Sequence, residues 1–302
     1  MRIATQTISD TMIQQIQTLS AQQAQYQQQL SSGDRITNPS DDPSAMNQVL
    51  NMQSQMQSLQ QISSNNSTAT AITQQSYSAL NNLQSISTSA GELVTEGASG
   101  TTSPADYAAY SQQLTQLIKQ ALDTANTQYN GNYIFGGTQT TTPPFTATYD
   151  ASGNVTGVTY TGTASGISME TGQGNTVSPY TDGATNQQMA DFINNLVTLQ
   201  SAMNSASPTA VQATQSSLQT SEDNVITAVS GIGAVQSGLQ ADQALNQSAF
   251  TSLQGLVSTD TSTDVATTTV QFSQAQAAYQ AALEAGAKIM ADPLINLLTA
   301  VT

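Results

Sequence analysis

The chain has 302 residues with 19 acidic and four basic side chains, a formal net charge of −15, and neither Cys nor His. This charge excludes a sequence-blind grip on nucleic-acid phosphates and disfavours an anionic membrane surface. The missing residue types exclude disulfides, thiol chemistry, the usual zinc ligands and a histidine general base. Charged residues make up 8% of the chain, against roughly 25% in ordinary domains, so weak self-repulsion favours self-association.

The first 30 residues predict a long helix with one apolar stripe. This stripe, which we call the N-terminal seam, consists of Met12, Ile16, Leu19, Tyr26 and Leu30. Gln23 occupies the one position of the repeat that has no apolar residue. The gaps of 4, 3, 4, 3 and 4 residues give the heptad spacing of helices that pack lengthwise. The alternative is an ordinary amphipathic helix on a globular core. No apolar h-region follows Arg2, so we expect no ordinary secretion signal.

Residues 30–45, LSSGDRITNPSDDPSA, interrupt the helical pattern. Asp42 is expected to cap the next helix, with Pro43 in its first position. The candidate residues of this corner motif are Gly33, Arg35, Pro39, Asp41, Asp42 and Pro43. A strongly punctuated corner between two long, almost uncharged helices predicts a joint in an assembly and not an enzyme pocket. The far end of the chain is its expected partner.

Helical patterns then run from residue 43 to about 94 and from Ser103-Pro104 to about residue 128. Residues 130–182 are rich in Gly, Thr and Pro and break the helix. Two alternating segments, FTATYD and VTGVTYTG, flank residues 151–154 and predict a β-hairpin. Further short strands and turns are expected between residues 166 and 183. The middle of the chain is therefore a small β insertion.

Helices resume at about residue 186 and at Pro208. The second of these carries a heptad of Val211, Leu218, Val225, Ile232 and Leu239. Residues 259–264 are a polar interruption before the last helix. That helix has apolar residues at heptad-compatible places, which we call the C-terminal seam: Phe272, Tyr279, Leu283, Met290, Leu294 and Leu297.

The helices at the two ends match in length and texture, which predicts that they pair. The expected fold is mainly α, a long-helix bundle or coiled coil formed by both chain ends, with a small β-rich outer domain inserted in the middle. The expected domains are a terminal coiled coil (1–40 and 265–302), a helical-bundle middle domain (41–140 and 186–264) and a β-rich insertion (141–185).

Close carboxylate pairs occur at Asp41-Asp42, Glu222-Asp223 and Glu92/Glu96. Helix capping and solvated faces explain them better than acid–base catalysis, because no supporting aromatic or polar constellation accompanies them. Gly231-Ile232-Gly233 lacks the third glycine and the preceding strand of a dinucleotide site. We therefore expect no catalytic, cofactor or metal site, and no enzyme.

Three stretches together resemble the flagellin superfamily: LSSGDRITNPSDDPSA, ANTQYNGNYIFGGTQTTTPPF (residues 125–145) and AQAAYQAALEAGAKIMADPLINLL (residues 275–298). Within it they are most similar to the hook-associated members of the distal hook–filament junction, because filament flagellins typically carry alanines in place of Pro39 and Pro43. The central motif consists of Asn126, Asn130, Gly131, Tyr133, Phe135, Gly137 and Phe145. Asp34 departs from the family, in which a basic residue is usual here.

The resemblance implies a structural subunit of the bacterial flagellum that forms the junction ring between hook and filament and adapts hook-side packing to the flagellin lattice. It implies export through the flagellar type III channel, without a cleaved signal, to an extracellular location. The implied partners are copies of the chain in a ring, a hook-side junction protein, flagellin, and an export chaperone on the C-terminal helix. Neither nucleic acid nor membrane is an implied partner. The alternatives are a filament flagellin, or an unrelated secreted coiled-coil protein such as a needle-tip component or adhesin.

Overall fold

The computed structural model describes the backbone of residues 2–299 and the side chains of residue 7 and residues 10–288. The chain divides into two compact units. We call residues 1–57 with 250–302 the terminal unit and residues 58–249 the central unit.

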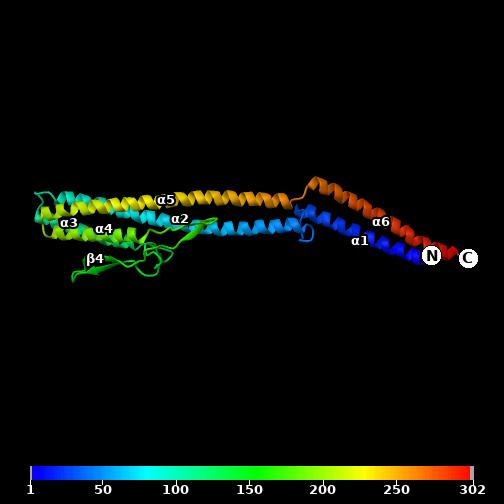
Figure 1. Cartoon of the computed structure of the whole chain (residues 1–302), viewed down its shortest axis with the longest axis horizontal. Coiled ribbons are helices and arrows are strands. Elements are labelled where there is room, and N and C mark those ends of the chain that lie inside the picture. Colours follow the sequence, from blue (N-terminus) through cyan, green and yellow to red (C-terminus); the bar gives the residue numbers. More distant parts are fainter. Residues whose placement is uncertain (1, 300–302) are drawn as a thin grey trace. The chain divides into compact units, whose positions relative to one another are not determined.

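In the terminal unit, α1 (Arg2–Ser32) and α6 (Val265–Thr299) lie side by side (Figure 1). The unit also contains the beginning of α2 (Pro43–Gly97) and the end of α5 (Pro208–Thr261). The predicted pairing of the helices at the two chain ends is thus confirmed.

The central unit combines the remaining lengths of α2 and α5 with α3 (Pro104–Ala125) and α4 (Gly183–Asn204). The Ser103 side chain accepts the backbone N–H of Asp106, and the Asp106 carboxylate accepts the backbone N–H of Ser103, so the predicted start of α3 is confirmed. The five heptad residues of α5 named above are all buried. Four of them, Val211, Leu218, Val225 and Ile232, form the main core cluster of the unit together with the apolar faces of α2, α3 and α4. The largest fully buried side chains in this cluster are Phe135, Phe145 and Phe192.

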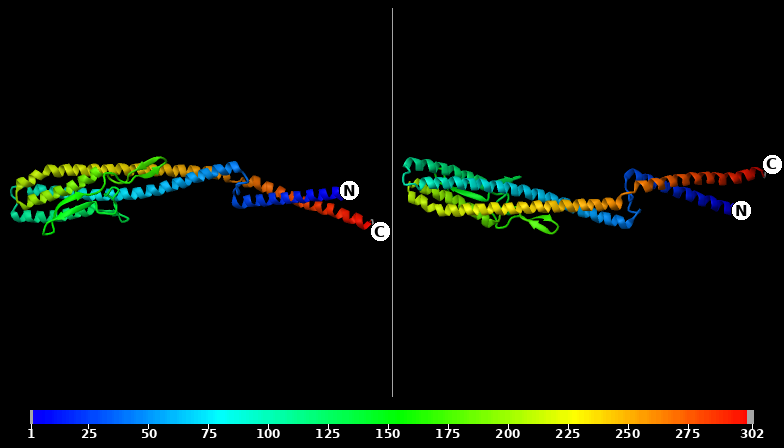
Figure 2. Two further views of the ribbon diagram at one scale, coloured as in Figure 1. Left: turned by 60° about the horizontal axis from the view of Figure 1, so that its bottom comes forward. Right: turned by 90° about the horizontal axis from the view of Figure 1, so that it is seen from above.

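Six short strands form three separate antiparallel hairpins beside these helices (Figure 2). The hairpins are β1 (Gln128–Tyr129) with β2 (Asn132–Tyr133), β3 (Phe145–Tyr149) with β4 (Val155–Tyr160), and β5 (Met169–Gly172) with β6 (Asn175–Val177). The β3–β4 hairpin turns where the sequence predicts it. Its residues Phe145, Val155 and Val158 are buried in the core of the helices.

The fold is therefore mainly α with a small β insertion, as the sequence predicts. The division into three domains stays a prediction. No helix within residues 2–299 combines the length and the hydropathy needed to cross a membrane.

Candidate assembly site

The N-terminal seam lies on the half-buried face of α1. All five of its residues, and Gln23 between them, are half-buried, whereas most of their neighbours along the helix are exposed. On α6 the corresponding stripe consists of Thr268, Phe272, Ala275, Tyr279, Ala282 and Gly286. It has the same heptad spacing, so each helix presents one narrow face to its partner.

Small residues allow the two helices to approach closely. A Cβ atom added to Gly286 would lie 3.5 Å from Cδ1 of Ile16 and 3.8 Å from Cγ of Met12, which is ordinary van der Waals contact. Leu283, which the sequence assigns to the C-terminal seam, lies beside the stripe and is 44% exposed. The side chains of Met290, Leu294 and Leu297 fall outside the described residues.

The N-terminal corner is held by backbone and carboxylate hydrogen bonds. α1 ends because Gly33, at φ +79°, takes the left-handed conformation, and its N–H donates to the Gln29 carbonyl at 2.9 Å. Asp41 Oδ2 accepts the N–H groups of Asn38 (2.9 Å) and Thr37 (3.1 Å) and the Thr37 hydroxyl. These donors stabilise the carboxylate and lower the pKa of Asp41. Pro39 is exposed in the same turn.

The start of α2 has the predicted cap. Pro43 is its first residue, and Asp42 Oδ1 accepts the N–H of Ala45 at 3.1 Å. This N–H is the main cause that lowers the pKa of Asp42, and the Arg35 guanidinium adds a smaller contribution. The carboxylate therefore stays ionised well below neutral pH.

A second corner, residues 261–264 between α5 and α6, pairs directly with the first. The Arg35 N–H donates to the Thr261 carbonyl at 2.6 Å, and the Thr263 N–H donates to the Gly33 carbonyl at 2.9 Å. Asp34 and Ser262 form an antiparallel bridge between these bonds. The two chain corners thus form a miniature two-stranded pairing, and the sequence expectation that the far end partners the corner is realised in these bonds.

Arg35 fastens this pairing with its side chain. One guanidinium nitrogen donates to the Asp260 carbonyl at 3.1 Å, and the other lies 3.5 Å from Asp42 Oδ2. The Gln29 amide donates to the Arg35 carbonyl at 2.9 Å. One residue therefore contacts the end of α1, the start of α2 and the end of α5.

Sequence reasoning missed the residues on the C-terminal side of the joint. Asp264 caps α6: its carboxylate accepts the Thr267 hydroxyl at 2.8 Å and the N–H of Ala266 at 3.0 Å, and the Thr267 hydroxyl is the main cause of a lowered pKa. The sequence does carry a signal for this cap, because Asp264 is followed three residues later by Thr267 where the apolar helical pattern begins. Gln29 carried no such signal.

The central motif builds the interior of the central unit. Asn130 and Gly131, at φ 51° and 80°, form the β1–β2 turn. The Asn126 amide pairs with the backbone N–H and carbonyl of Phe145 at 3.1 and 2.9 Å. Phe135 and Phe145 are buried, whereas Tyr133 is half-buried.

Gly137 of the central motif cannot carry a side chain. Its φ is +67°, and an added Cβ would collide with Thr163. Sequence reasoning missed Asn186, which is fully buried and whose amide donates to the Phe135 carbonyl at 2.9 Å. These contacts give the motif a folding role within this unit.

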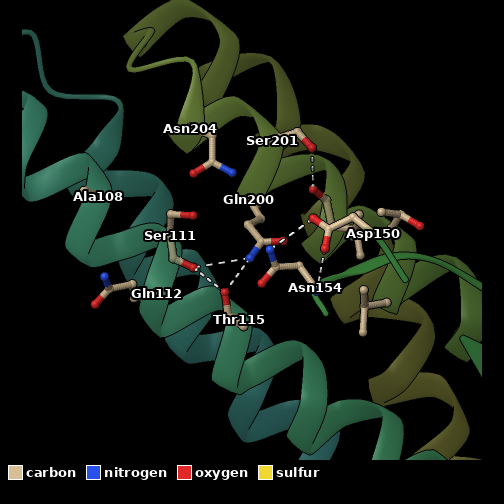
Figure 3. A pocket seen from close by; sticks show the side chains of 12 residues that line it. Ala108, Ser111, Gln112, Thr115, Asp150, Asn154, Gln200, Ser201 and Asn204 are labelled. Carbon is tan, nitrogen blue, oxygen red and sulfur yellow. Dashed lines mark hydrogen bonds between the residues drawn. The ribbon is translucent and has the colours of Figure 1, made fainter. Parts of the chain in front are cut away.

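A cavity of about 430 Å³ lies between α3, α4 and the β3–β4 turn (Figure 3). Gln200 of α4 reaches across to α3, and its amide donates to the Thr115 hydroxyl at 2.6 Å. Asp150 is the one carboxylate in the lining, and its Oδ1 accepts the N–H groups of Ser152 and Asn154 of its own turn. The lining assembles no acid–base pair or activated nucleophile.

Among the side chains that the structure describes, no group of three carboxylates could hold a metal ion. The paired corners and the facing stripes of α1 and α6 are therefore the candidate site.

Comparison with known proteins agrees with this arrangement. Residues 3–140 match the bacterial flagellin N-terminal helical region. The chain is 32% identical over 146 residues to flagellar hook-associated protein 3 of Escherichia coli, and to the same protein of Salmonella typhimurium. Each alignment covers 48% of this chain and 46% of the relative, so the chain spans about half the length of these relatives.

Two solved structures share the fold over more of the chain. A Vibrio parahaemolyticus protein assigned to the flagellar hook-associated proteins covers 73% of this chain and is itself covered to 99%, with a TM-score of 0.64 and 19% identity. FlgL of Bacillus cereus covers 69% and is covered to 99%, with a TM-score of 0.59 and 18% identity. The solved structures thus show a shared fold, and residues 3–140 show similarity to the bacterial flagellin N-terminal helical region.

Proposed function

We propose that the chain is a structural subunit of the bacterial flagellum that forms the junction ring between hook and filament. In this role it adapts the packing of the hook side to the flagellin lattice. Its task is mechanical and needs no catalysis. The similarity to hook-associated protein 3 supports the role, and one structural observation carries it: the two chain ends form a joined helix pair with apolar residues left on its outside.

The outward residues of the helix pair support assembly with neighbouring subunits. Among the described side chains of α1 and α6, each helix covers one stripe against the other. Ile13 is 42% exposed, Leu283 44% and Val270 56%. A two-helix pair has no second layer to cover such residues, so burying them against other subunits is favourable.

The paired corners support the mechanical part of the proposal. Backbone bonds link the corners in both directions, and Arg35 ties them to the adjoining helix ends. These bonds fasten the end of α1, the start of α2 and the end of α5 to one another within the terminal unit. Such a joint would let a ring subunit carry load through both chain ends.

The proposed partners follow from this role. They are copies of the chain within the ring, a junction protein on the hook side, flagellin on the filament side, and an export chaperone that holds the α6 segment before assembly. We propose that the subunit leaves the cell unfolded through the flagellar type III channel without cleavage and resides in the extracellular flagellum.

A filament flagellin is the second candidate, because the matched N-terminal region is shared by filament subunits. The test is electron microscopy of a strain that lacks this gene, with flagellin assayed in the culture medium. Bare hooks with flagellin lost to the medium are expected for the junction role. Complete hooks without any flagellin would make this chain the filament subunit, and normal filaments would overturn both candidates.

A further inference from the structure

The β5–β6 hairpin is attached to the central unit differently from the β3–β4 hairpin. The β3–β4 hairpin places Phe145, Val155 and Val158 in the hydrophobic core. The β5–β6 hairpin contributes no residue to that core, and hydrogen bonds to α2 and α5 hold it in place. Its position therefore depends on polar side chains of the two long helices.

Thr171 is the centre of this attachment. It is the extra residue of a β-bulge between Glu170 and Gly172, and it is fully buried. A bulge residue is left out of the strand ladder, which frees its backbone groups for other partners. The Thr171 carbonyl accepts the side-chain amide of Asn246 from α5 at 2.7 Å and that of Asn66 from α2 at 3.4 Å. A single oxygen thus links the two helices.

Neighbouring bonds strengthen the same link. The Thr171 hydroxyl donates to Asp242 Oδ2 of α5 at 2.8 Å, and the Asn175 amide donates to the same oxygen at 3.0 Å. The Asn65 amide of α2 donates to the Glu170 carbonyl at 3.0 Å. Two of these hydrogen bonds join the hairpin to α2 and three join it to α5.

Asn66 and Asn246 occupy positions that heptad spacing reserves for apolar residues. Asn246 follows Leu239 by seven residues, and Asn66 follows Leu59 by seven, and all four side chains are buried. The Asn66 Oδ1 atom has no hydrogen-bond partner, which is unfavourable for a buried polar atom. Buried asparagines in a helix seam reduce stability but specify how the helices align.

The main core cluster ends on the long helices at Ile72 and Ile232, short of this level. We propose that Thr171 is a positioning residue: through Asn66, Asp242 and Asn246 it holds α2 and α5 in one alignment beyond the end of that cluster. The Thr171 carbonyl accepts from both asparagines only when the two side chains lie at the same height along the antiparallel helices. The inference concerns the fold of the central unit and does not depend on the flagellar role.

The experiment measures the alignment directly by pulsed electron paramagnetic resonance. The chain has no cysteine, so spin labels attach only where cysteines are introduced. One pair of exposed sites, Gln60→Cys and Gln243→Cys, reports on the helices near Thr171. A second pair, Thr88→Cys and Gln219→Cys, reports on the helices within the core.

Two variants break the link in different ways. The first replaces residues 169–177 by a glycine–serine linker, and the second is the double substitution N66L/N246L, which removes both amide donors and leaves an apolar seam. The Thr171 carbonyl then loses both amide donors, whereas the two leucines continue the buried apolar positions of Leu59 and Leu239, which favours a folded chain. The matched control is Q74L/Q236L, which removes a cross-helix amide pair that does not touch Thr171.

In both variants we expect the distance distribution at residues 60 and 243 to broaden while that at 88 and 219 is unchanged. Amide exchange in the nearby segments 60–70 and 239–249 should accelerate about tenfold, the equivalent of about one hydrogen bond. The control and the conservative variant Thr171→Ser should keep the narrow distribution. A narrow distribution in both variants would overturn the proposal, and so would broadening at both label pairs.

Discussion

Replacing Arg35 by alanine tests the joint between the two chain corners. The change removes the guanidinium bond to the Asp260 carbonyl at 3.1 Å and the contact with Asp42 at 3.5 Å. The contact with Asp42 contributes little, because the two side chains are 49% and 34% exposed. The bond to the carbonyl contributes about 1 kcal/mol. The backbone bonds across the corners remain.

This loss should raise the population of the open pairing, and with it the rate of amide exchange, about fivefold. The assay is amide exchange of the backbone N–H groups of residues 35 and 263 in the Arg35→Ala variant. In the native chain these two groups donate hydrogen bonds across the corners at 2.6 and 2.9 Å. The control is Asp42→Asn, which retains a capping side chain and should change exchange less. Unchanged exchange at both amides in Arg35→Ala would refute the role of the guanidinium, and complete loss of protection would show that it does more than fasten a backbone pairing.

Three further predictions concern the terminal unit. Gly286→Ala should stabilise the helix pair by about 1 kcal/mol, because alanine favours helix and its Cβ meets Ile16 at ordinary contact distance, whereas Gly286→Ile should destabilise it by about 1–3 kcal/mol. Thermal melts followed by circular dichroism measure both changes, and destabilisation of the pair by Gly286→Ala as well would contradict this prediction. Leu283→Asp should leave the monomer folded but abolish assembly, since the side chain is 44% exposed beside the α6 stripe; motility equal to wild type would refute this. Because the folded pKa values of Asp41 and Asp42 are lowered, their contribution to stability is complete above the unfolded pKa near 4 and is lost as the pH falls through the folded values. Corner amide resonances in nuclear magnetic resonance spectra should therefore stay constant from about pH 8 to 5 and shift only below about pH 4, and a transition near neutral pH would contradict the assignment.

The N-terminal features were predictable because each has a local signal. Gaps of three and four residues identify the half-buried stripe of α1, including Gln23. The Asp42-Pro43 cap follows from side-chain chemistry within one turn. Such features depend on residues close in sequence, so the sequence is enough to find them.

The α6 stripe could not be predicted from hydrophobicity. Hydrophobicity assigns Leu283 to the seam, but Leu283 is exposed, whereas Ala282 is half-buried and Gly286 is buried. Where two helices approach closely, small residues fill the interface, and a ranking by hydrophobicity passes over them. The face that α6 turns towards α1 therefore depends on how the two helices fit together, and the sequence of α6 alone does not determine it.

The attachment of Thr171 lies further beyond prediction. It joins residues 66, 171 and 246, each separated from the next by at least 75 positions, through a bulge in a strand of four residues. Neither heptad spacing nor turn chemistry signals such a contact. Only the vacant apolar places at Asn66 and Asn246 hint that something polar lies opposite them.

The most direct test of the proposed role is immunogold labelling of this chain on intact flagella. An epitope tag inserted at the β3–β4 turn, whose residues 151–153 are exposed, leaves both chain ends unchanged. We expect gold particles at one place on each flagellum, where the hook meets the filament. Label along the whole filament, or no label on the flagellum at all, would contradict it.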